Sequence, residues 1–381
     1  MSTSLRKRLA VCILARNEEN NLAEAIASVR EVADQVFVTD TGSTDRTVTI
    51  AEEQGASVDY WPWRDDFGAA RNHQLDLAKD YDWLLILDAD ERLHSHQKSL
   101  LDEALNRKNC AGLSLLRRDL QDLDNLDSGT EMLVLRLIRP SSGLRFIGRC
   151  HVQQTSKEHL IEHCEVRLLH YGYLEEYLPA KTRRSLKLLR LELEERPGQL
   201  YYQIELYRTL ALLGDAEAKE ALRAAAAHLA SAQNNPRAPL EHAALLLEGL
   251  LQLPSAQLPA PFTPVKVESL CKRWFPEAPP LLWLRARNAF IREDWEEAEK
   301  LLGTLVSCGE SDNYDRYTSF DSAILGKEAA LNLAACKIKL GHLEEATDLL
   351  EPLQKDPKTG PAASANLALI AELSQQLSEL S

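Results

Sequence analysis

Along the first ninety residues, short unbroken apolar runs alternate with stretches in which apolar residues have helical spacing. The runs Leu9–Ala15 and Trp83–Leu87 are typical of strands buried on both faces of a parallel sheet. In Asn20–Val32 and Phe67–Asp80 the apolar side chains recur every three or four residues, which predicts amphipathic helices. This alternation of strands and helices predicts βαβ units and an α/β domain with a mostly parallel, doubly wound sheet.

The pattern changes twice further along the chain. Beyond Cys110 it predicts shorter strands of the antiparallel kind, at Gly112–Leu116, Glu131–Ile138 and Val166–Leu169. From about residue 178 the composition becomes rich in Leu, Ala and Glu, and the period becomes helical. Helix–turn–helix units are predicted at Tyr201–Ala225, Leu281–Leu302 and Ala329–Leu353. We therefore expect an α/β domain over residues 1–176 and an all-α helical repeat domain over residues 177–381.

Charge and cysteine content restrict the class of function. The formal net charge of −14 argues against nucleic acid as a partner, because phosphate backbones are bound by basic clusters. Apart from the strand-like runs, no apolar stretch approaches the ~20 residues that span a bilayer, so no integral membrane segment is expected. The seven cysteines are scattered singly, without a CxxC pair, which favours a reducing cytoplasm over a disulfide framework.

Polar residues follow the predicted strands at the points where each strand ends. The segments that begin at Arg16, Asp40 and Asp88 should converge on one rim, since parallel strands share their carboxyl edge. Asp88 and Asp90 are two positions apart, so in extended backbone both carboxylates point to the same side. Carboxylates together with phosphate oxygens suit a hard cation such as Mg²⁺ or Mn²⁺. An acidic loop after a buried strand is the alternative explanation.

Four segments in order resemble the family 2 glycosyltransferases, whose catalytic domain has the Rossmann-like GT-A fold. The resemblance covers roughly the first 175 residues, and the subgroup it resembles most joins this domain to tetratricopeptide-type (TPR-like) repeats. The segments are Leu14–Glu19 (LARNEE), Thr39–Thr47 (TDTGSTDRT), Asp66–Asn72 (DFGAARN) and Leu87–Glu91 (LDADE).

The resemblance implies a donor site for a nucleotide-sugar, with UDP as the expected nucleotide. Asn17 and Glu18 would contact the nucleoside, and Asp40 would accept hydrogen bonds from the base or ribose. Arg71 would hold the diphosphate through its guanidinium. We assign Asp45 and Asn72, which lie in the same segments, to the donor-binding set as well.

The resemblance also implies a metal site and a base. Asp88 and Asp90 would bridge Mn²⁺ or Mg²⁺ to the diphosphate, and His170, in the segment His170–Tyr173, would be a further ligand. The segment Phe146–His151 resembles one that ends in His-Glu in the family, but Val152 stands where the Glu is expected. His151 is therefore the candidate general base. Asp66 is the alternative base, and Asp90 completes the predicted catalytic set.

These features predict an inverting, metal-assisted glycosyltransferase of the hexosyltransferase type. The acceptor would be a peptide, a protein or a saccharide, presented by the helical repeats, which could also pair two copies of the chain. The first alternative is a non-catalytic scaffold with a degenerate nucleotide-sugar domain, which the loss of the His-Glu pair favours. A nucleotidyltransferase is the second, but the segment after the first strand is not the glycine-rich basic loop it would need.

Overall fold

In the computed structural model the chain forms two compact units, Met1–Ala218 and Lys219–Ser381. The structure describes residues 7–120, 130–155, 158–172, 178–311, 313–315 and 320–380. The first unit includes two helices beyond the boundary that the sequence predicts at residues 176 and 177, and that boundary itself lies outside the described residues. The division into domains of residues 1–176 and 177–381 therefore stays a prediction.

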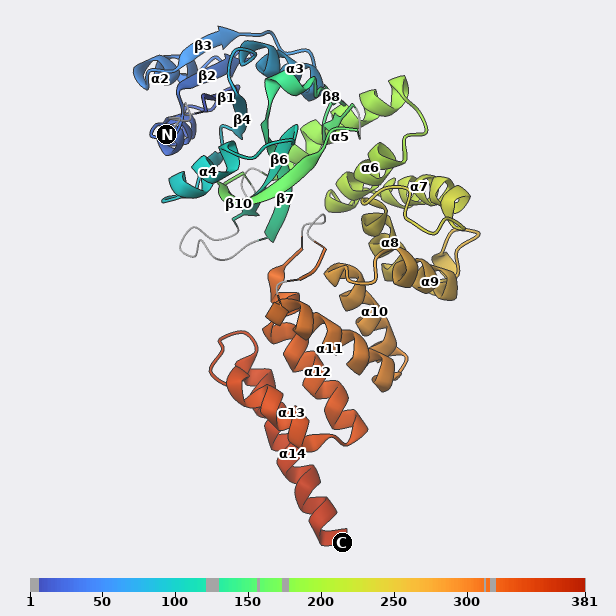
Figure 1. The fold of residues 1–381 in the computed structure, drawn as a ribbon. Coiled ribbons are helices and arrows are strands. Elements are labelled where there is room, and N and C mark those ends of the chain that lie inside the picture. Colours follow the sequence, from blue (N-terminus) through green and yellow to red (C-terminus); the bar gives the residue numbers. More distant parts are fainter. Residues whose placement is uncertain are drawn as a thin grey trace. The chain divides into compact units, whose positions relative to one another are not determined.

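The first unit is built on an eight-stranded, mostly parallel sheet, as the alternation of apolar patterns predicts (Figure 1). Its strand order is β3-β2-β1-β4-β7-β6-β10-β5. The strands are β1 Leu9–Ala15, β2 Gln35–Asp40, β3 Ser57–Tyr60, β4 Trp83–Asp88, β5 Glu91–Leu93, β6 Gly112–Asp119, β7 Thr130–Ile138 and β10 Ile161–His170. β7 runs against both β4 and β6, and β5 runs against β10, whereas the other pairs are parallel. A separate two-stranded sheet joins β8 Phe146–Ile147 to β9 Gln153–Gln154.

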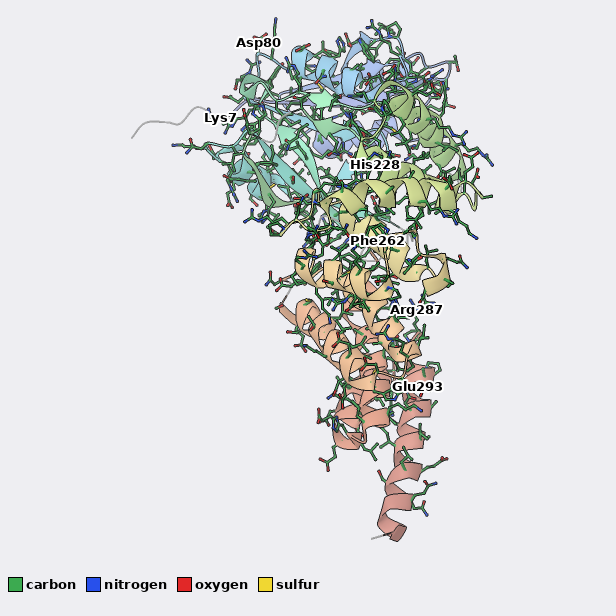
Figure 2. All side chains as sticks on the ribbon, turned by 90° about the vertical axis from the view of Figure 1, so that its right-hand side faces the viewer. Lys7, Asp80, His228, Phe262, Arg287 and Glu293 are labelled. Atoms are coloured by element: carbon green, nitrogen blue, oxygen red, sulfur yellow. The ribbon has the colours of Figure 1, made fainter. Side chains whose placement is uncertain are left out.

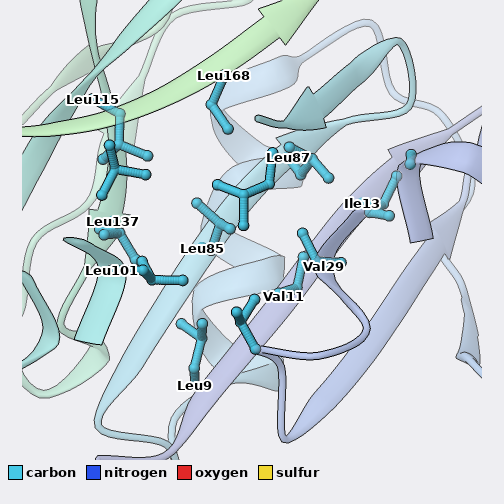
Figure 3. Close-up of a cluster of buried hydrophobic side chains, with 14 of the residues drawn as sticks. Leu9, Val11, Ile13, Val29, Leu85, Leu87, Leu101, Leu115, Leu137 and Leu168 are labelled. Atoms are coloured by element: carbon cyan, nitrogen blue, oxygen red, sulfur yellow. The ribbon is translucent and has the colours of Figure 1, made fainter. Parts of the chain in front are cut away.

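Apolar residues fill both faces of the central strands, which explains the unbroken runs in the sequence. On one face Leu9, Val11 and Ile13 of β1 join Leu85 and Leu87 of β4 in the main core (Figure 3). The intervening residues of the same strands, such as Cys12 and Ile86, belong to a second core on the opposite face. The helices of this unit are α1 Leu22–Val29, α2 Thr47–Glu53, α3 Phe67–Leu77, α4 Lys98–Leu105, α5 Leu178–Glu195 and α6 Leu200–Leu212. Because successive side chains of a strand point to opposite faces, both faces of the sheet are buried by apolar residues.

The last residues of four strands gather at one edge of the sheet. β7 is antiparallel to both β4 and β6, so β6 has the direction of β4, and β10 is parallel to β6. β2, β4, β6 and β10 therefore end at the same edge, at Asp40, Asp88, Asp119 and His170 respectively. The sequence predicts this convergence for Asp40 and Asp88. It extends to Asp119 and His170, at the ends of two strands that are parallel to each other, although the sequence pattern predicts antiparallel strands there.

α5 and α6 pack against the loops of the first unit. Leu188 and Leu189 of α5 form a buried cluster with Tyr202 of α6 and with Cys150, which follows β8. Gly148 of the same loop has a φ of 111°, and a β-carbon at this position would overlap the hydroxyl oxygen of Tyr202. The region from Phe146 to His151 is thereby fixed between α3 and α5.

The second unit is all-helical, which confirms the predicted change of fold class. Its helices are α7 Ala218–Ala232, α8 Ala243–Gln252, α9 Pro264–Trp274, α10 Pro279–Ile291, α11 Trp295–Ser311, α12 Lys327–Leu340, α13 Leu343–Leu350 and α14 Gly360–Leu380. The predicted pairs α10–α11 and α12–α13 are present, and Gly341 ends α12 with a φ of 83°. His228 of α7, Arg287 of α10 and Glu293 between α10 and α11 are exposed (Figure 2). Among the described residues, no helix is both long enough and apolar enough to traverse a bilayer.

Candidate active site

Asp88, the last residue of β4, is held by two arginines from different elements. Arg71 of α3 contacts its Oδ1, and Nη2 of Arg136 in β7 donates to its Oδ2 at 2.6 Å. Burial alone would raise the pKa of this carboxyl, but the charges of Arg136 and Arg71 outweigh it and hold the pKa well below its usual range. Asp88 is therefore ionised, and 32% of its side-chain surface remains exposed.

Glu91 is a buried carboxylate that holds Asp88 in place, both directly and through Arg136. Its side chain is fully buried, and its Oε1 accepts from Nη2 of Arg136 at 2.5 Å. Its other oxygen, Oε2, accepts from the backbone N–H of Asp88 at 3.0 Å. Arg136 thus bridges a buried carboxylate to the partly exposed one at the end of β4.

Asp90 has its own pair of partners. Its Oδ2 is in an ion pair with Nζ of Lys181 in α5, and its Oδ1 lies 3.5 Å from Nε2 of His170. Burial opposes the charge of Asp90, yet His170 and Lys181 lower the pKa of this carboxyl below its ordinary value. Nδ1 of His170 lies 2.7 Å from Oδ1 of Asp119, at the end of β6. Burial works against a charged imidazole, but hydrogen bonds to the two aspartates raise the pKa of His170.

The predicted metal ligands Asp88, Asp90 and His170 do lie together, but in this arrangement they do not fit a divalent ion. Among the described residues, no group of three or more His, Cys, Asp and Glu side chains is placed to hold one. Lys181 forms an ion pair with Oδ2 of Asp90, so an ion bound by this oxygen would meet the ammonium. An ammonium about 4 Å from a divalent ion repels it by roughly 8 kcal/mol at an effective dielectric constant of about 20. Their assignment as metal ligands stays a prediction.

Two predicted donor-binding residues, Asn17 and Asp40, accept hydrogen bonds from the backbone of the loop after β2. The Asp40 carboxylate accepts from the N–H groups of Gly42 and Ser43 at 3.0–3.2 Å. Asn17, with a φ of 57°, accepts at Oδ1 from the N–H of Thr44 at 2.8 Å. The bond from Thr44 to Asn17 ties the segment after β1 to the segment after β2, and the bonds to Asp40 close the turn after β2. Together they shape a rim of short polar loops.

Asp45 and Glu18 complete these loops. Asp45 accepts from the N–H groups of Thr47 and Glu19, so it acts in the turn before α2. Glu18 accepts from Asn21, and burial raises the pKa of its carboxyl, while the charges of Lys181 and Arg184 in α5 act in the opposite direction. The charges on α5 therefore lie near the loop after β1 as well as near Asp90.

Two other predicted residues have local structural roles. Asp66 is the N-cap of α3 and accepts from the N–H of Ala69 at 2.9 Å. Asn72 exchanges two hydrogen bonds with the backbone of Phe146 in β8, at 2.9 and 2.8 Å. The amide of Asn72 thus fixes the position of β8 against α3.

His151 lies in the loop between β8 and β9, with a φ of 46°, which is uncommon for a residue other than glycine. Its Nδ1 is 3.4 Å from Oε2 of Glu205 in α6, and its side chain is 37% exposed whereas that of Glu205 is buried. Val152, at the position where the resemblance expects Glu, packs against the second core instead. A carboxylate therefore reaches His151 from α6 and not from the next residue along the chain.

The helix α5 contacts both Asp90 and the loop that carries His151. Sγ of Cys150 lies 3.9 Å from the carbonyl oxygen of Ser185, one helical turn after Lys181. The ammonium of Lys181 contacts Asp90. One face of α5 thus runs from the carboxyl end of β4 to the loop that carries His151.

Three functional candidates were not predicted from the sequence: Arg136, Lys181 and Glu205. An arginine between Leu135 and Leu137 in a predicted strand is the pattern that could have identified Arg136. Lys181 and Glu205 lie on amphipathic helices, where a charged residue is ordinarily solvated, so the pattern alone did not distinguish them.

The similarity of this chain to a known family lies in the first unit. The family model described as "Glycosyl transferase family 2" matches residues 10–145. A TPR repeat-containing protein of Synechococcus elongatus is 39% identical over 114 residues, which are 30% of this chain and 28% of that protein. An uncharacterized glycosyltransferase of Rickettsia bellii is 42% identical over 103 residues, covering 27% of this chain and 33% of its own. The chain thus spans a third or less of these relatives.

Longer but weaker likenesses also occur. Glycosyltransferase SunS, derived from the SPbeta prophage of Bacillus subtilis, is 26% identical over 204 residues, 50% of this chain and 47% of that one. A solved structure of glucosyl-3-phosphoglycerate synthase from Mycobacterium tuberculosis, in complex with Mn²⁺, UDP and glucosyl-3-phosphoglycerate, has a TM-score of 0.26 at 26% identity. It covers 29% of this chain and 44% of its own.

The arrangement around Asp88 predicts a large cost for removing Arg136. Arg136→Met would remove the closer of the two cations paired with the buried Glu91, leaving Arg117 at 3.8 Å, and would also remove a partner of Asp88, so we expect a loss of about 3–5 kcal/mol in the free energy of unfolding. Arg145→Met removes an exposed pair with Asp76 and should cost less than about 1 kcal/mol. Urea unfolding of both variants followed by tryptophan fluorescence measures the difference. Equal, small losses would contradict the bridging role of Arg136.

Proposed function

We propose that this chain, which matches the family model "Glycosyl transferase family 2" over residues 10–145, is an inverting transferase that moves a sugar from a nucleotide-diphosphate donor to a hydroxyl or similar group of an acceptor. The observation that carries the proposal is the meeting of Arg71 and Asp88 at the carboxyl edge of the sheet, beside the loops of Asn17 and Asp40. Ligands of open α/β sheets bind at this edge.

The donor would lie with its nucleoside over the loops after β1 and β2. The N–H groups and side chains of these loops already form a polar rim, and the expected nucleotide, by family resemblance, is UDP. Its diphosphate would lie near the guanidinium of Arg71, which is 7% exposed and is held in place by Gln74 at 3.0 Å and by Asp88. In this arrangement side chains of the protein bind the diphosphate, without the Mn²⁺ or Mg²⁺ that the resemblance implies.

In an inverting transfer the acceptor oxygen attacks the anomeric carbon of the donor while the bond from that carbon to the diphosphate oxygen breaks. The leaving diphosphate gains negative charge, which nearby cations stabilise in the transition state. The acceptor loses a proton, which a base must take.

We propose His151 as that base. Its Nδ1 faces the buried Glu205, which orients the ring and leaves Nε2 to receive the proton. Asp66 is less suited to this role because its carboxylate caps α3. Asp90 is less suited because both its oxygens face cations.

The acceptor is proposed to be a peptide, a protein or a saccharide. The helical second unit supports this class, because stacked helix pairs present extended surfaces of the kind that bind chains.

Nucleotide binding tests the donor site directly. We expect isothermal titration to detect UDP binding by the full chain, and Arg71→Met to weaken it by about tenfold or more, because the diphosphate loses its guanidinium. Arg64→Met, which alters an arginine stacked over Trp61 in the same unit, should leave the affinity unchanged. Folded protein that binds none of UDP, GDP, CDP or ADP would contradict the transferase and favour a scaffold.

Donor turnover tests the base. With water as acceptor, release of UDP from a panel of UDP-sugars should fall by about 10²–10⁴ in His151→Ala, while UDP affinity is retained. Glu205→Gln should lower the rate less, and the double variant should be no slower than His151→Ala alone, since Glu205 acts through the imidazole. A full rate in His151→Ala together with a large loss in Asp66→Asn would assign the base to Asp66.

A further inference from the structure

The carboxylates at the end of β4 face cations that belong to the protein. Asp88 faces Arg71 and Arg136, and Asp90 faces His170 and Lys181. Arg71, Arg136 and His170 are buried, whereas 35% of the side chain of Lys181 is exposed. Of these four cations, Lys181 is thus the most accessible to a bound ligand.

The position of the Lys181 ammonium is closely confined. It lies against Oδ2 of Asp90, next to Gly172, which follows β10. A β-carbon at Gly172 would overlap Nζ of Lys181 and Oδ2 of Asp90, and would lie 2.7 Å from Nε2 of His170. The absence of a side chain at residue 172 therefore provides the space that the ammonium fills.

A second cation of α5, Arg184, lies near the same carboxyl edge of the sheet. Arg184 lies one helical turn after Lys181, and both charges act on the Glu18 carboxyl after β1. The guanidinium of Arg184 also lies 5.5 Å from the centre of the Phe67 ring, at the start of α3. The first turns of α5 thus present positive charge to the ends of β1 and β4, where the proposed donor would carry its two phosphates.

From this geometry we propose that Lys181 takes the place of the divalent cation in this site and binds the diphosphate of the nucleotide together with Arg71. The inference rests on the proposed function, because it concerns the same donor site. An ammonium held by Asp90 has three N–H donors, of which one faces the carboxylate and the others can reach phosphate oxygens. It neutralises part of the charge on the leaving diphosphate without a metal ion.

The proposal predicts how nucleotide binding responds to chelator. UDP should bind the full-length wild-type chain with the same affinity, within about threefold, in EDTA and in Mn²⁺. Lys181→Ala should lose about tenfold or more in EDTA and regain affinity in Mn²⁺, because the freed Asp90 can then ligate the ion. Arg190→Ala, on the same helix and paired with Glu217 outside the site, is the matched control and should behave as wild type.

Manganese binding without nucleotide gives an independent readout. Electron paramagnetic resonance should show no Mn²⁺ bound through Asp90 in the wild type, and bound Mn²⁺ in Lys181→Ala that disappears in Lys181→Ala/Asp90→Asn. Thermal unfolding of each variant checks that the fold is retained.

The outcomes separate the two proposals. Wild-type UDP binding that is abolished by EDTA would overturn the role of Lys181 while leaving the transferase function intact, and so would Asp90-dependent Mn²⁺ binding by the wild type. Lys181→Ala binding UDP in EDTA as tightly as wild type would overturn it too. Absence of binding by UDP, GDP, CDP and ADP in every condition contradicts the proposed function, and the manganese experiment then still tests whether Lys181 occupies the cation position.

Discussion

The compensation of buried charge at the carboxyl edge of the sheet is the constraint on which the first unit depends. Asp88, Asp90, Glu91 and Asp119 lie within one small region, and four ionised carboxylates there would repel one another and lack water. Arg71, Arg136, Arg117, His170 and Lys181 supply the opposite charges. Since breaking a buried ion pair costs more than the pair contributes, each member fixes the position of the next.

Sheet topology is what makes this compensation feasible. The reversed strand β7 inserts between β4 and β6, and so places Arg136 directly beside the end of β4. The parallel strands β6 and β10 then bring Asp119 and His170 to the same edge as Asp88. α5 contributes Lys181, and its next turns lead to the loop of His151. The elements that hold the carboxylates of the proposed donor site and the proposed base therefore form one connected set of contacts.

Much of the fold follows from the residue pattern, because burial on both faces leaves a distinct trace in a strand. Period and composition predict the buried strands β1 and β4, the location of Asp88 beside other polar loops, and the helical second unit. Asn72 and Asp66 illustrate a limit of this reasoning. Their residue types suit ligand binding, but the same types also cap helices and pair with backbone, and only the three-dimensional contacts separate the two roles.

Residues distant in sequence set the second limit. Lys181 meets Asp90 across 91 positions, and Glu205 reaches His151 from a helix that carries no motif. Val152 removes a carboxylate from the expected position, and the chain supplies another one from α6. A motif comparison registers the loss but not the replacement, because the replacement depends on how α6 packs against the loop after β8.

The most direct test of the central claim is a crystal structure of the full chain with UDP, with anomalous data to locate any Mn²⁺ in the crystals. The nucleotide should lie at the carboxyl edge of the sheet, with its base over the loops after β1 and β2 and its diphosphate beside Arg71 and Lys181. A nucleotide bound elsewhere on the chain, or a diphosphate turned away from Asp88 and these two cations, would contradict the assignment of this edge as the donor site.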